Sequence, residues 1–434
     1  MRKKAFFWLV TVILALTSLR PVWAQEGSEF ENPSVLIPVT LGGTYNRFRV
    51  AVTDFQPIKP GGNVDGNAQD LSRRLATNLD MTGFFELVDP RASLERDPRA
   101  GLSQGPPIDY APWAQIGTNL VIKAAIEGSR SNTVLEMFLF DISTGRQLLA
   151  KRYTGPAKEG QKMIARFTND VLLSVTGESG VFGSKIIFVS GDKSAQSIMI
   201  TELGLDEAET LAPPKGGPAT EPTLGPGNKT AWTHRNGNRW ELVSNGRVVH
   251  SGDTVFTPAY SPSGALVAGL SGRVSTNIAL FEGRSSRQLT TGGSIEISPT
   301  FSPDGRMAYV SDKGGIGIYV APAGGGNGVR ISPPGTSTDP SWSPKGDKIA
   351  FVYRQRDICI MNPDGSNVIQ LTNQGVNHHP SFSPDGRMIV FSSTRSGGSK
   401  LYVMSANGDR QQPLMSDNKG ASQTLPTWSP ELPE

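Results

Sequence analysis

The residues able to perform metal or proton chemistry are few in this chain, and their spacing favours neither. The 434 residues include four histidines and one cysteine. His378 and His379 are adjacent, and no HExxH or CxxC motif suggests a zinc site. We therefore expect no metal and no cofactor, and we interpret the histidine pair as part of a polar loop that contacts a partner protein. Cys359 lies between two isoleucines, which is typical of a small buried apolar residue.

Two aspartates offer a second possible chemistry, as carboxylate catalysts or calcium ligands. Asp304 and Asp385 both stand in the tetrapeptide Ser-Pro-Asp-Gly. In such a turn proline presets φ, aspartate accepts hydrogen bonds from the nearby backbone, and glycine adopts positive φ. Lys345 and Ser263 occupy the same place in sister copies of the segment. We therefore interpret both aspartates as turn residues.

Two tryptophans could stack on sugar rings. Trp342 and Trp428 occupy one position of the same repeated segment, and that position is filled elsewhere by Tyr260 and Phe301. A position that accepts any large aromatic ring favours packing over specific sugar recognition. We expect these side chains to pack between structural repeats.

The elements that position these residues are repeats of the phrase Pro-x-aromatic-Ser-Pro-Asp-Gly followed by an apolar run. The serine position recurs at residues 225, 261, 302, 343, 383 and 429, with the first copy worn and the last truncated. Within each period, short apolar runs alternate with glycine-rich turns, which predicts several strands. A period of about 40 residues with this content is typical of a β-propeller, with one four-stranded sheet per copy.

The two ends of the repeat region complete one another. No strand can follow the last copy at 426–430, whereas residues 184–201 predict later strands of a blade that lacks its opening phrase. Stacked blades bury their faces only when the ring closes. The sequence therefore predicts a six-bladed β-propeller over 184–434, closed by the C-terminal strand.

The N-terminus has the pattern of a secretory signal. A basic start, Arg2–Lys4, precedes an apolar run and the small residue Ala24. We expect cleavage between Ala24 and Gln25, which assigns residues 1–24 to a signal peptide and the protein to an extracytoplasmic compartment. Residues 25–33 are polar and acidic, and we expect them to form an exposed tail.

Residues 34–176 predict one small α/β domain that mixes helices and strands. Leu71, Leu75 and Leu79 recur every four residues in an amphipathic helix over 67–81. A hinge over 177–183 joins this domain to the propeller. Net charge is +3 with acids and bases nearly balanced, so no nucleic-acid partner is expected. The other expected helices cover 109–116 and 160–175, and the expected strands cover 48–55, 84–88, 120–122, 133–140 and 147–153.

The order of these parts closely resembles the TolB family, the periplasmic propeller proteins of the Tol-Pal envelope system of Gram-negative bacteria. The resemblance rests on the signal, the small domain, the hinge Ser174–Phe182 (SVTGESGVF), the six repeats and the ending Pro-Thr-Trp-Ser-Pro. The chain departs from the family at Leu224 and Gly225, where the aromatic residue and the serine are lost. It departs again at Ala165-Arg166, where the family often has Ala-His.

The resemblance implies a function without catalysis. Members of this family bind the lipoprotein Pal through one propeller face, and so associate peripherally with the outer membrane. Their mature N-terminal segment binds TolA, and they support outer-membrane integrity and envelope constriction at cell division. Some bacteriocins occupy the same propeller face. The resemblance thus implies a periplasmic protein with two partner-binding sites.

We assign candidate residues to both sites. The Pal site is placed on the loops that connect successive blades, at 213–221, 251–257, 291–298, 332–339, 372–379 and 415–425, which should be exposed. The candidate TolA-binding residues are Glu26, Glu29, Phe30 and Glu31. The candidate Pal-binding residues are Thr254, Glu296, Thr336, Asp339, His378 and His379.

Two other functions remain open from the residues themselves. A secreted hydrolase or glycan-active propeller would need a nucleophile, but Gly177–Gly180 and Gly269–Gly272 do not complete the Gly-x-Ser-x-Gly motif. Propeller-capped serine peptidases also need an additional α/β-hydrolase domain, for which residues 34–176 are too few. A small-ligand sensor would use the central channel of the propeller, as ligand sites often occupy concave positions.

Overall fold

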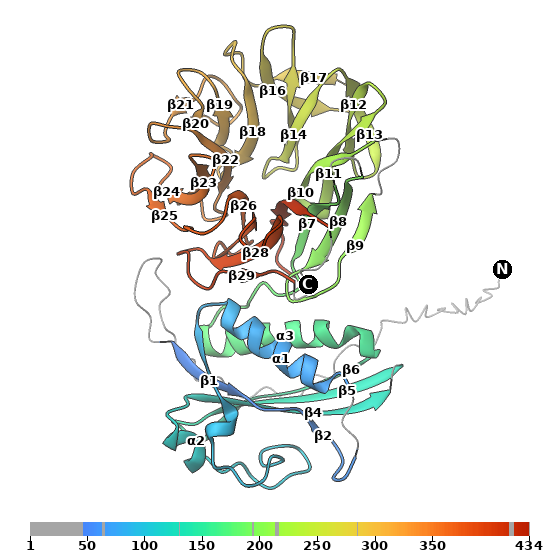
Figure 1. The fold of residues 1–434 in the computed structure, drawn as a ribbon, viewed down its shortest axis with the longest axis vertical. Coiled ribbons are helices and arrows are strands. Elements are labelled where there is room, and N and C mark those ends of the chain that lie inside the picture. Colours follow the sequence, from blue (N-terminus) through green and yellow to red (C-terminus); the bar gives the residue numbers. More distant parts are fainter. Residues whose placement is uncertain are drawn as a thin grey trace, which may run out of the picture.

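The computed structural model describes residues 47–433 except 63–65, 130, 193–194, 213–216, 284 and 416–420. It contains two bodies, a small α/β domain and a ring of sheets (Figure 1). The proposed cleavage site at Ala24 and Gln25 lies outside the described residues. So do the tail residues Glu26, Glu29, Phe30 and Glu31.

The α/β domain is built on one mixed sheet with the strand order β3-β1-β4-β5-β6, and β2 pairs with β4. β3, β1 and β4 run parallel, whereas β4, β5 and β6 form an antiparallel meander. The elements are β1 Phe48–Val52, β2 Gln56–Pro57, α1 Ala68–Met81, β3 Phe85–Val88, a 3-10 turn Pro90–Ala92, α2 Ala111–Gln115, β4 Leu120–Ser129, β5 Asn132–Asp141, β6 Arg146–Gly155, a 3-10 turn Ala157–Glu159 and α3 Gly160–Thr176.

The two long helices pack on one face of this sheet. Leu71, Leu75 and Leu79 of α1 are buried together with Phe167 and Val171 of α3. The spacing of these apolar residues gives each helix a single apolar stripe, which explains why both helices were predictable. Gly177 ends α3 in the left-handed conformation at φ 77°, as is usual for a C-terminal glycine.

The propeller consists of six four-stranded antiparallel sheets, as the repeats predict. From the innermost strand outwards the blades are β10 Ala219–Gly225, β11 Lys229–Asn236, β12 Arg239–Ser244, β13 Arg247–Gly252; β14 Val255–Tyr260, β15 Leu266–Ser271, β16 Thr276–Glu282, β17 Ser285–Gln288; β18 Glu296–Phe301, β19 Met307–Ser311, β20 Gly317–Ala321, β21 Val329–Arg330; β22 Ser337–Trp342, β23 Ile349–Tyr353, β24 Asp357–Met361, β25 Ile369–Gln370; β26 Asn377–Phe382, β27 Met388–Ser393, β28 Lys400–Ser405, β29 Gln412–Pro413; and β30 Gln423–Trp428, β7 Lys185–Ser190, β8 Ser197–Glu202, β9 Glu209–Ala212.

The sixth blade joins the two ends of the repeat region. β30 pairs with β7, and Trp428 lies opposite Ile186. Trp428 is 3% exposed, and its indole Nε1 donates to Ser184 Oγ at 2.7 Å. The C-terminal strand therefore closes the ring, as the sequence predicts.

Each innermost strand contains an irregularity at the residue before its proline. The register shifts there in all six blades. These residues have φ values between 44° and 55°, in the left-handed region that non-glycine residues rarely adopt. They are Glu221, Thr257, Ser298, Asp339, His379 and Leu425.

This irregularity corrects the prediction for the connecting loops. Glu296, Asp339, His378 and His379 were assigned to loops, but they belong to the strands β18, β22 and β26. A proline and a bulge break the alternation that marks a strand in sequence, so only the half after the proline was recognised. Proline is tolerated here because the innermost strand is the edge of its sheet.

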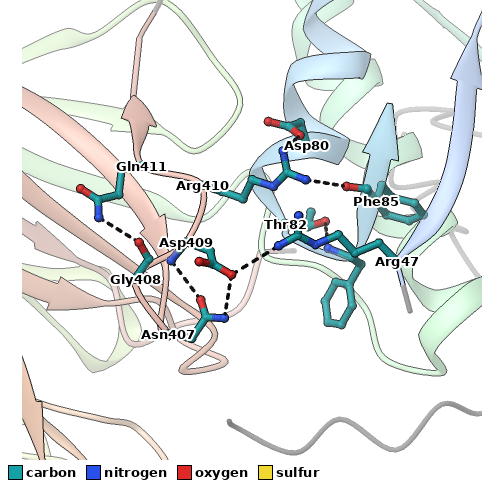
Figure 2. Close-up of polar contacts among 10 residues, drawn as sticks. Arg47, Asp80, Thr82, Phe85, Asn407, Gly408, Asp409, Arg410 and Gln411 are labelled. Atoms are coloured by element: carbon teal, nitrogen blue, oxygen red, sulfur yellow. Dashed lines mark hydrogen bonds and ion pairs between the residues drawn. The ribbon is translucent and has the colours of Figure 1, made fainter. Parts of the chain in front are cut away.

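Charged residues hold the α/β domain against the propeller. Arg410, in the turn between β28 and β29, donates to Asp80 Oδ1 at 2.6 Å and to the carbonyl of Phe85 at 3.5 Å (Figure 2). Arg47 reaches Asp409 Oδ2 at 3.3 Å. One apolar core continues through the interface. Among the residues that the structure describes, no helix is long and apolar enough to cross a membrane.

Candidate partner-binding face

The antiparallel blades give the propeller two distinct faces. One face carries the turns between the first and second strands and between the third and fourth strands of each blade. We call it the domain face, because Arg387 and Arg410 contact the α/β domain there. The open face carries the turns between second and third strands and the connections between blades. A channel of about 370 Å³ runs through the ring, lined by the six innermost strands.

The six left-handed residues form a ring around this channel. Their order in the chain is their order around the ring, because each blade contributes one. Thr257 N donates to Glu221 Oε2 at 2.7 Å, and Ser298 N donates to Thr257 Oγ1 at 2.8 Å. His379 N donates to Asp339 Oδ2 at 3.3 Å. In three of the six steps, therefore, the side chain of one left-handed residue accepts the backbone N–H of the next.

Three of the predicted site residues come together on this ring. His378 Nδ1 and His379 Nε2 each lie 3.7 Å from Asp339 Oδ2. Burial opposes ionisation of Asp339, but the charge of His379 and hydrogen bonds from both histidines lower its pKa overall. Burial lowers the pKa of His379 despite the attraction of Asp339. Within the described parts of residues 47–433, no group of three or more His, Cys, Asp or Glu side chains is arranged to hold a metal ion.

The opposite carboxylate of the ring behaves differently. Glu221 lies three blades away from Asp339 and accepts Thr257 N and Thr233 Oγ1. Burial raises its pKa, and these two hydrogen bonds only partly offset that effect. The channel thus carries one carboxylate that is readily ionised and one that burial keeps closer to neutral.

The other predicted residues of the open face are less exposed than expected. Thr254 and Thr336 are half-buried in the connections before β14 and β22. Glu296 is only 2% exposed, so the prediction that it lies on the surface is wrong. It starts β18 at the position that Ser337 and Asn377 hold in their blades, and both of those residues are also buried. Among the residues that the structure describes, Glu296 Oε2 has no hydrogen-bond partner.

In three blades the hydroxyl residue that follows the proline joins neighbouring blades. Trp342 N donates to Thr300 Oγ1 at 3.2 Å, and Phe382 N donates to Ser341 Oγ at 3.3 Å. Trp428 N donates in the same way to Ser381 Oγ at 2.9 Å. The hydroxyl residue of the repeat thus binds the backbone of the next innermost strand, which has no sheet partner on that side.

The structure places the two turn aspartates as the sequence predicts. Asp304 interacts with Ser302 and Arg306, and the hydrogen bonds from these side chains lower its pKa to about 2. Asp385 accepts Ser383 Oγ at 2.5 Å and Arg387 N at 3.0 Å. Both carboxylates are therefore occupied in turn formation.

The aromatic and cysteine predictions also agree with the structure. Trp342 and Trp428 are buried between blades. Cys359 is 3% exposed, and burial raises the pKa of its thiol to about 11. The worn first repeat has a physical reason, since a Cβ on Gly225 would lie 2.4 Å from the ring of Tyr260. The ring of the next blade fills the space that serine occupies in the other copies.

Sequence reasoning missed a polar network beside the histidine pair. Asn377 Oδ1 accepts Arg395 Nη2 at 3.1 Å, and Arg395 Nη1 donates to Gln411 Oε1 at 2.7 Å. Gln411 follows Arg410, which contacts Asp80 of the α/β domain. This network therefore extends from the open face to the domain interface. No sequence signal marks it, because its members come from separate turns and strands.

The fold and the candidate site define a two-domain propeller protein, with a small α/β domain fixed to a ring whose open face and channel gather the candidate residues. Two family models match it: the TolB amino-terminal domain over residues 36–148 and the TolB beta propeller domain over residues 172–432. The chain belongs to the TolB family.

Individual relatives agree with this assignment. The chain is 31% identical over 398 residues to a protein TolB homolog of Chlorobium luteolum, with 88% of this chain and 90% of the relative covered. It is 32% identical over 200 residues to a Tol-Pal system protein TolB of Geobacter metallireducens, with 46% of this chain and 43% of the relative covered. The crystal structure of TolB from Acinetobacter baumannii has the same fold, with a TM-score of 0.75 at 20% identity over 89% of this chain and 98% of that chain.

Proposed function

We propose that this protein is a non-enzymatic periplasmic scaffold of the Tol-Pal system. It binds Pal through the open face of the propeller and TolA through residues 25–33, and so supports outer-membrane integrity and envelope constriction at division. The observation that carries the proposal is family membership over both domains, as the two family models together span most of residues 36–432.

The state of the candidate catalytic groups supports a binding role. Asp304 and Asp385 are occupied in turns, and Cys359 is a buried thiol with a raised pKa. Asp339 is held by His379 N and lies beside both ring histidines. Each of these groups has a structural role that accounts for its position, which favours a scaffold over a hydrolase.

The position of the open face supports its use by Pal. The α/β domain contacts the other face, so the connections between blades and the channel mouth are left for a partner. His378 and His379 are half-exposed there, with side-chain exposures of 37% and 34%. A standard interface buries about 1,600 Å² in total, which a rim of six blades can supply.

Contacts of Arg47, the first residue that the structure describes, support coupling between the two sites. Arg47 contacts Asp409, whose neighbour Arg410 contacts Asp80. Gln411 follows in the chain and contacts Arg395, which holds Asn377 beside the histidine pair. If Pal binding changes the state that residues 25–33 prefer, TolA must change the affinity for Pal by the same factor.

The test is capture from the cell envelope followed by direct binding. In vivo crosslinking and affinity capture of the mature protein should recover Pal and TolA, and calorimetry with purified Pal should then give saturable binding. A protein that recovers neither partner and binds neither in calorimetry would refute the proposal. Labelling with a serine-hydrolase probe should give no adduct, and a labelled serine would instead favour the hydrolase alternative.

A further inference from the structure

Basic side chains occupy or flank the turns between the second and third strands of four consecutive blades. These turns all lie on the open face. We call the set the basic crown; its members are Arg235, Arg239, Arg273, Lys313, Arg354 and Arg356, and all six are exposed.

The basic crown is not neutralised by neighbouring acids. None of its six side chains forms an ion pair with any acid that the structure describes. Arg235 Nε donates to the carbonyl of Gly237 at 3.2 Å, and the guanidinium of Arg354 lies 5.0 Å from the ring centre of Tyr353. These contacts fix the side chains and leave their charges in place.

The acids of the same four blades on this face are mostly buried or engaged. Glu241 lies 3.5 Å from His234 and accepts Asn236 Nδ2 at 3.1 Å. Asp312 accepts Ile295 N at 2.9 Å. The remaining acids are Glu221 and Asp339, which line the channel and accept backbone N–H groups, the buried Glu296, Asp357, which contacts Thr372, and the exposed Asp253. Among the described residues of these four blades, the outermost charges on the open face are therefore predominantly positive.

Three arginines of the domain face are paired with carboxylates. Arg306 pairs with Asp304 at 2.9 Å, Arg410 pairs with Asp80 at 2.6 Å, and Arg387 pairs with Glu178. The same propeller thus pairs these three arginines of the domain face with carboxylates and leaves those of the basic crown unpaired.

Exposed apolar residues lie beside the basic side chains. Val274 follows Arg273 and is 95% exposed. Ile295 lies near this turn, because it forms a β-bridge with Thr276. Ile295 and Ile316 are 50% and 41% exposed. Apolar side chains surrounded by charge are typical of a protein interface.

We propose that the basic crown recognises a partner protein whose docking surface is acidic and carries apolar side chains. This inference rests on the proposed function, because it uses the face assigned to Pal. Opposite charges at the rim of an interface accelerate encounter more than they strengthen the final complex. The basic crown should therefore set the association rate and its salt dependence, while Val274, Ile295 and Ile316 should set the dissociation rate.

The test is the kinetics of Pal binding as a function of salt. The crown variant is Arg273→Glu with Arg354→Glu. The matched control is Arg247→Glu with Lys345→Glu, which changes net charge equally at exposed turns on the domain face. At low salt the crown variant should associate about tenfold more slowly than the unmodified protein, with a weaker salt dependence, and the control should stay within about twofold. Val274→Ala with Ile295→Ala should raise the dissociation rate.

The outcomes separate this inference from the function on which it rests. Pal binding that is indifferent to salt and unaffected in the crown variant overturns the inference and leaves the scaffold proposal intact. Absence of Pal binding by the unmodified protein overturns both. Tighter, crown-dependent binding to vesicles that contain anionic lipid overturns the assignment of a protein partner. Circular dichroism and melting of each variant confirm that the fold is retained.

Discussion

Asp339 and His379 occupy consecutive blades, yet they are joined through both backbone and side chain. His379 N donates to Asp339 Oδ2 at 3.3 Å, and His379 Nε2 lies 3.7 Å from the same oxygen. Both residues have left-handed φ and both precede a proline. The strained conformation that carries the strand past its proline therefore also directs two titratable groups toward each other across a blade boundary.

This relationship predicts loss of stability in mild acid. The folded-state pKa values of His379 and Asp339 are both lowered, so at these two groups the folded protein binds fewer protons than the unfolded chain. The stability that His379 contributes is fully present above the ordinary histidine value of 6.5 and is lost as pH decreases toward its lowered value. A second loss follows below the ordinary aspartate value of 3.8, toward the lowered value of Asp339.

His379→Gln should flatten the first of these losses. Urea unfolding between about pH 8 and pH 5 should show a shallower decline of the free energy of unfolding than in the unmodified protein. His250, whose pKa burial also lowers, contributes a separate share, so the decline should not vanish. Superimposable pH profiles for the two proteins would contradict the assignment to His379.

Because β30 closes the ring, changes in this strand are expected to lower the stability and the cooperativity of unfolding. Trp428→Ala removes a buried indole and its hydrogen bond to Ser184, and should lower the free energy of unfolding by about 3–5 kcal/mol. Deleting residues 424–434 leaves β7 without its inner partner and should give aggregation or non-cooperative melting. Calorimetric melting measures both effects. A deletion variant that melts like its parent would show that the blade does not depend on β30.

Replacing Glu296 is expected to raise the stability of the fold. Its side chain is buried and Oε2 has no hydrogen-bond partner, an arrangement that costs free energy for a charged group. Glu296→Gln keeps the shape and removes the charge, so it should raise the free energy of unfolding by about 1 kcal/mol. The affinity for Pal should not change, as the side chain is covered. A lower melting temperature would indicate that the carboxylate has a partner in solution.

Replacing the histidine pair is expected to weaken Pal binding. His378→Ala with His379→Ala should weaken Pal binding about tenfold or more, because both side chains are half-exposed at the channel mouth. The control is His250→Ala on the outer strand β13, which should bind as the unmodified protein does. Calorimetric titration with Pal gives the affinities. Equal affinity in the double variant would place the Pal site elsewhere on the propeller.

Local patterns explain how much of this fold could be predicted. The Ser-Pro-Asp-Gly turns were recognisable because each residue has its own conformational role, and Asp385 behaves accordingly. The closing blade could be predicted because the first strand at Trp428 has no later strands after it, and the later strands at Ile186 have no first strand before them. Helix α1 could be predicted from the spacing of its leucines.

The candidate site was harder to predict because its geometry is not local. Nothing in the sequence marks His379 as left-handed, since β-bulges are set by pairing with the neighbouring strand. Burial of Glu296 depends on packing between two blades, so its polarity suggested exposure incorrectly. The contact of Asn377 with Arg395 and Gln411 joins separate turns and strands, which no periodicity reveals.

The tail predicts separable binding sites. Residues 25–33 are acidic and include Phe30 as their large apolar anchor, which suits docking to an edge or a groove of TolA. Deleting these residues should abolish TolA binding while Pal still binds through the propeller. Phe30→Ala should reproduce most of the loss, and Ser28→Ala, which keeps the anchor and the candidate acids, serves as its control.

The same deletion tests the coupling between tail and propeller. Arg47, the first residue that the structure describes, contacts Asp409, and the network through Gln411 and Arg395 reaches Asn377 at the open face. The affinity for Pal should therefore shift on deletion, and TolA should shift it in the unmodified protein through the same linkage. Arg395→Ala should reduce that shift while Pal still binds. Calorimetry with each partner in the presence and absence of the other measures these effects: TolA binding that survives the deletion refutes the tail site, whereas an unchanged affinity for Pal refutes only the coupling.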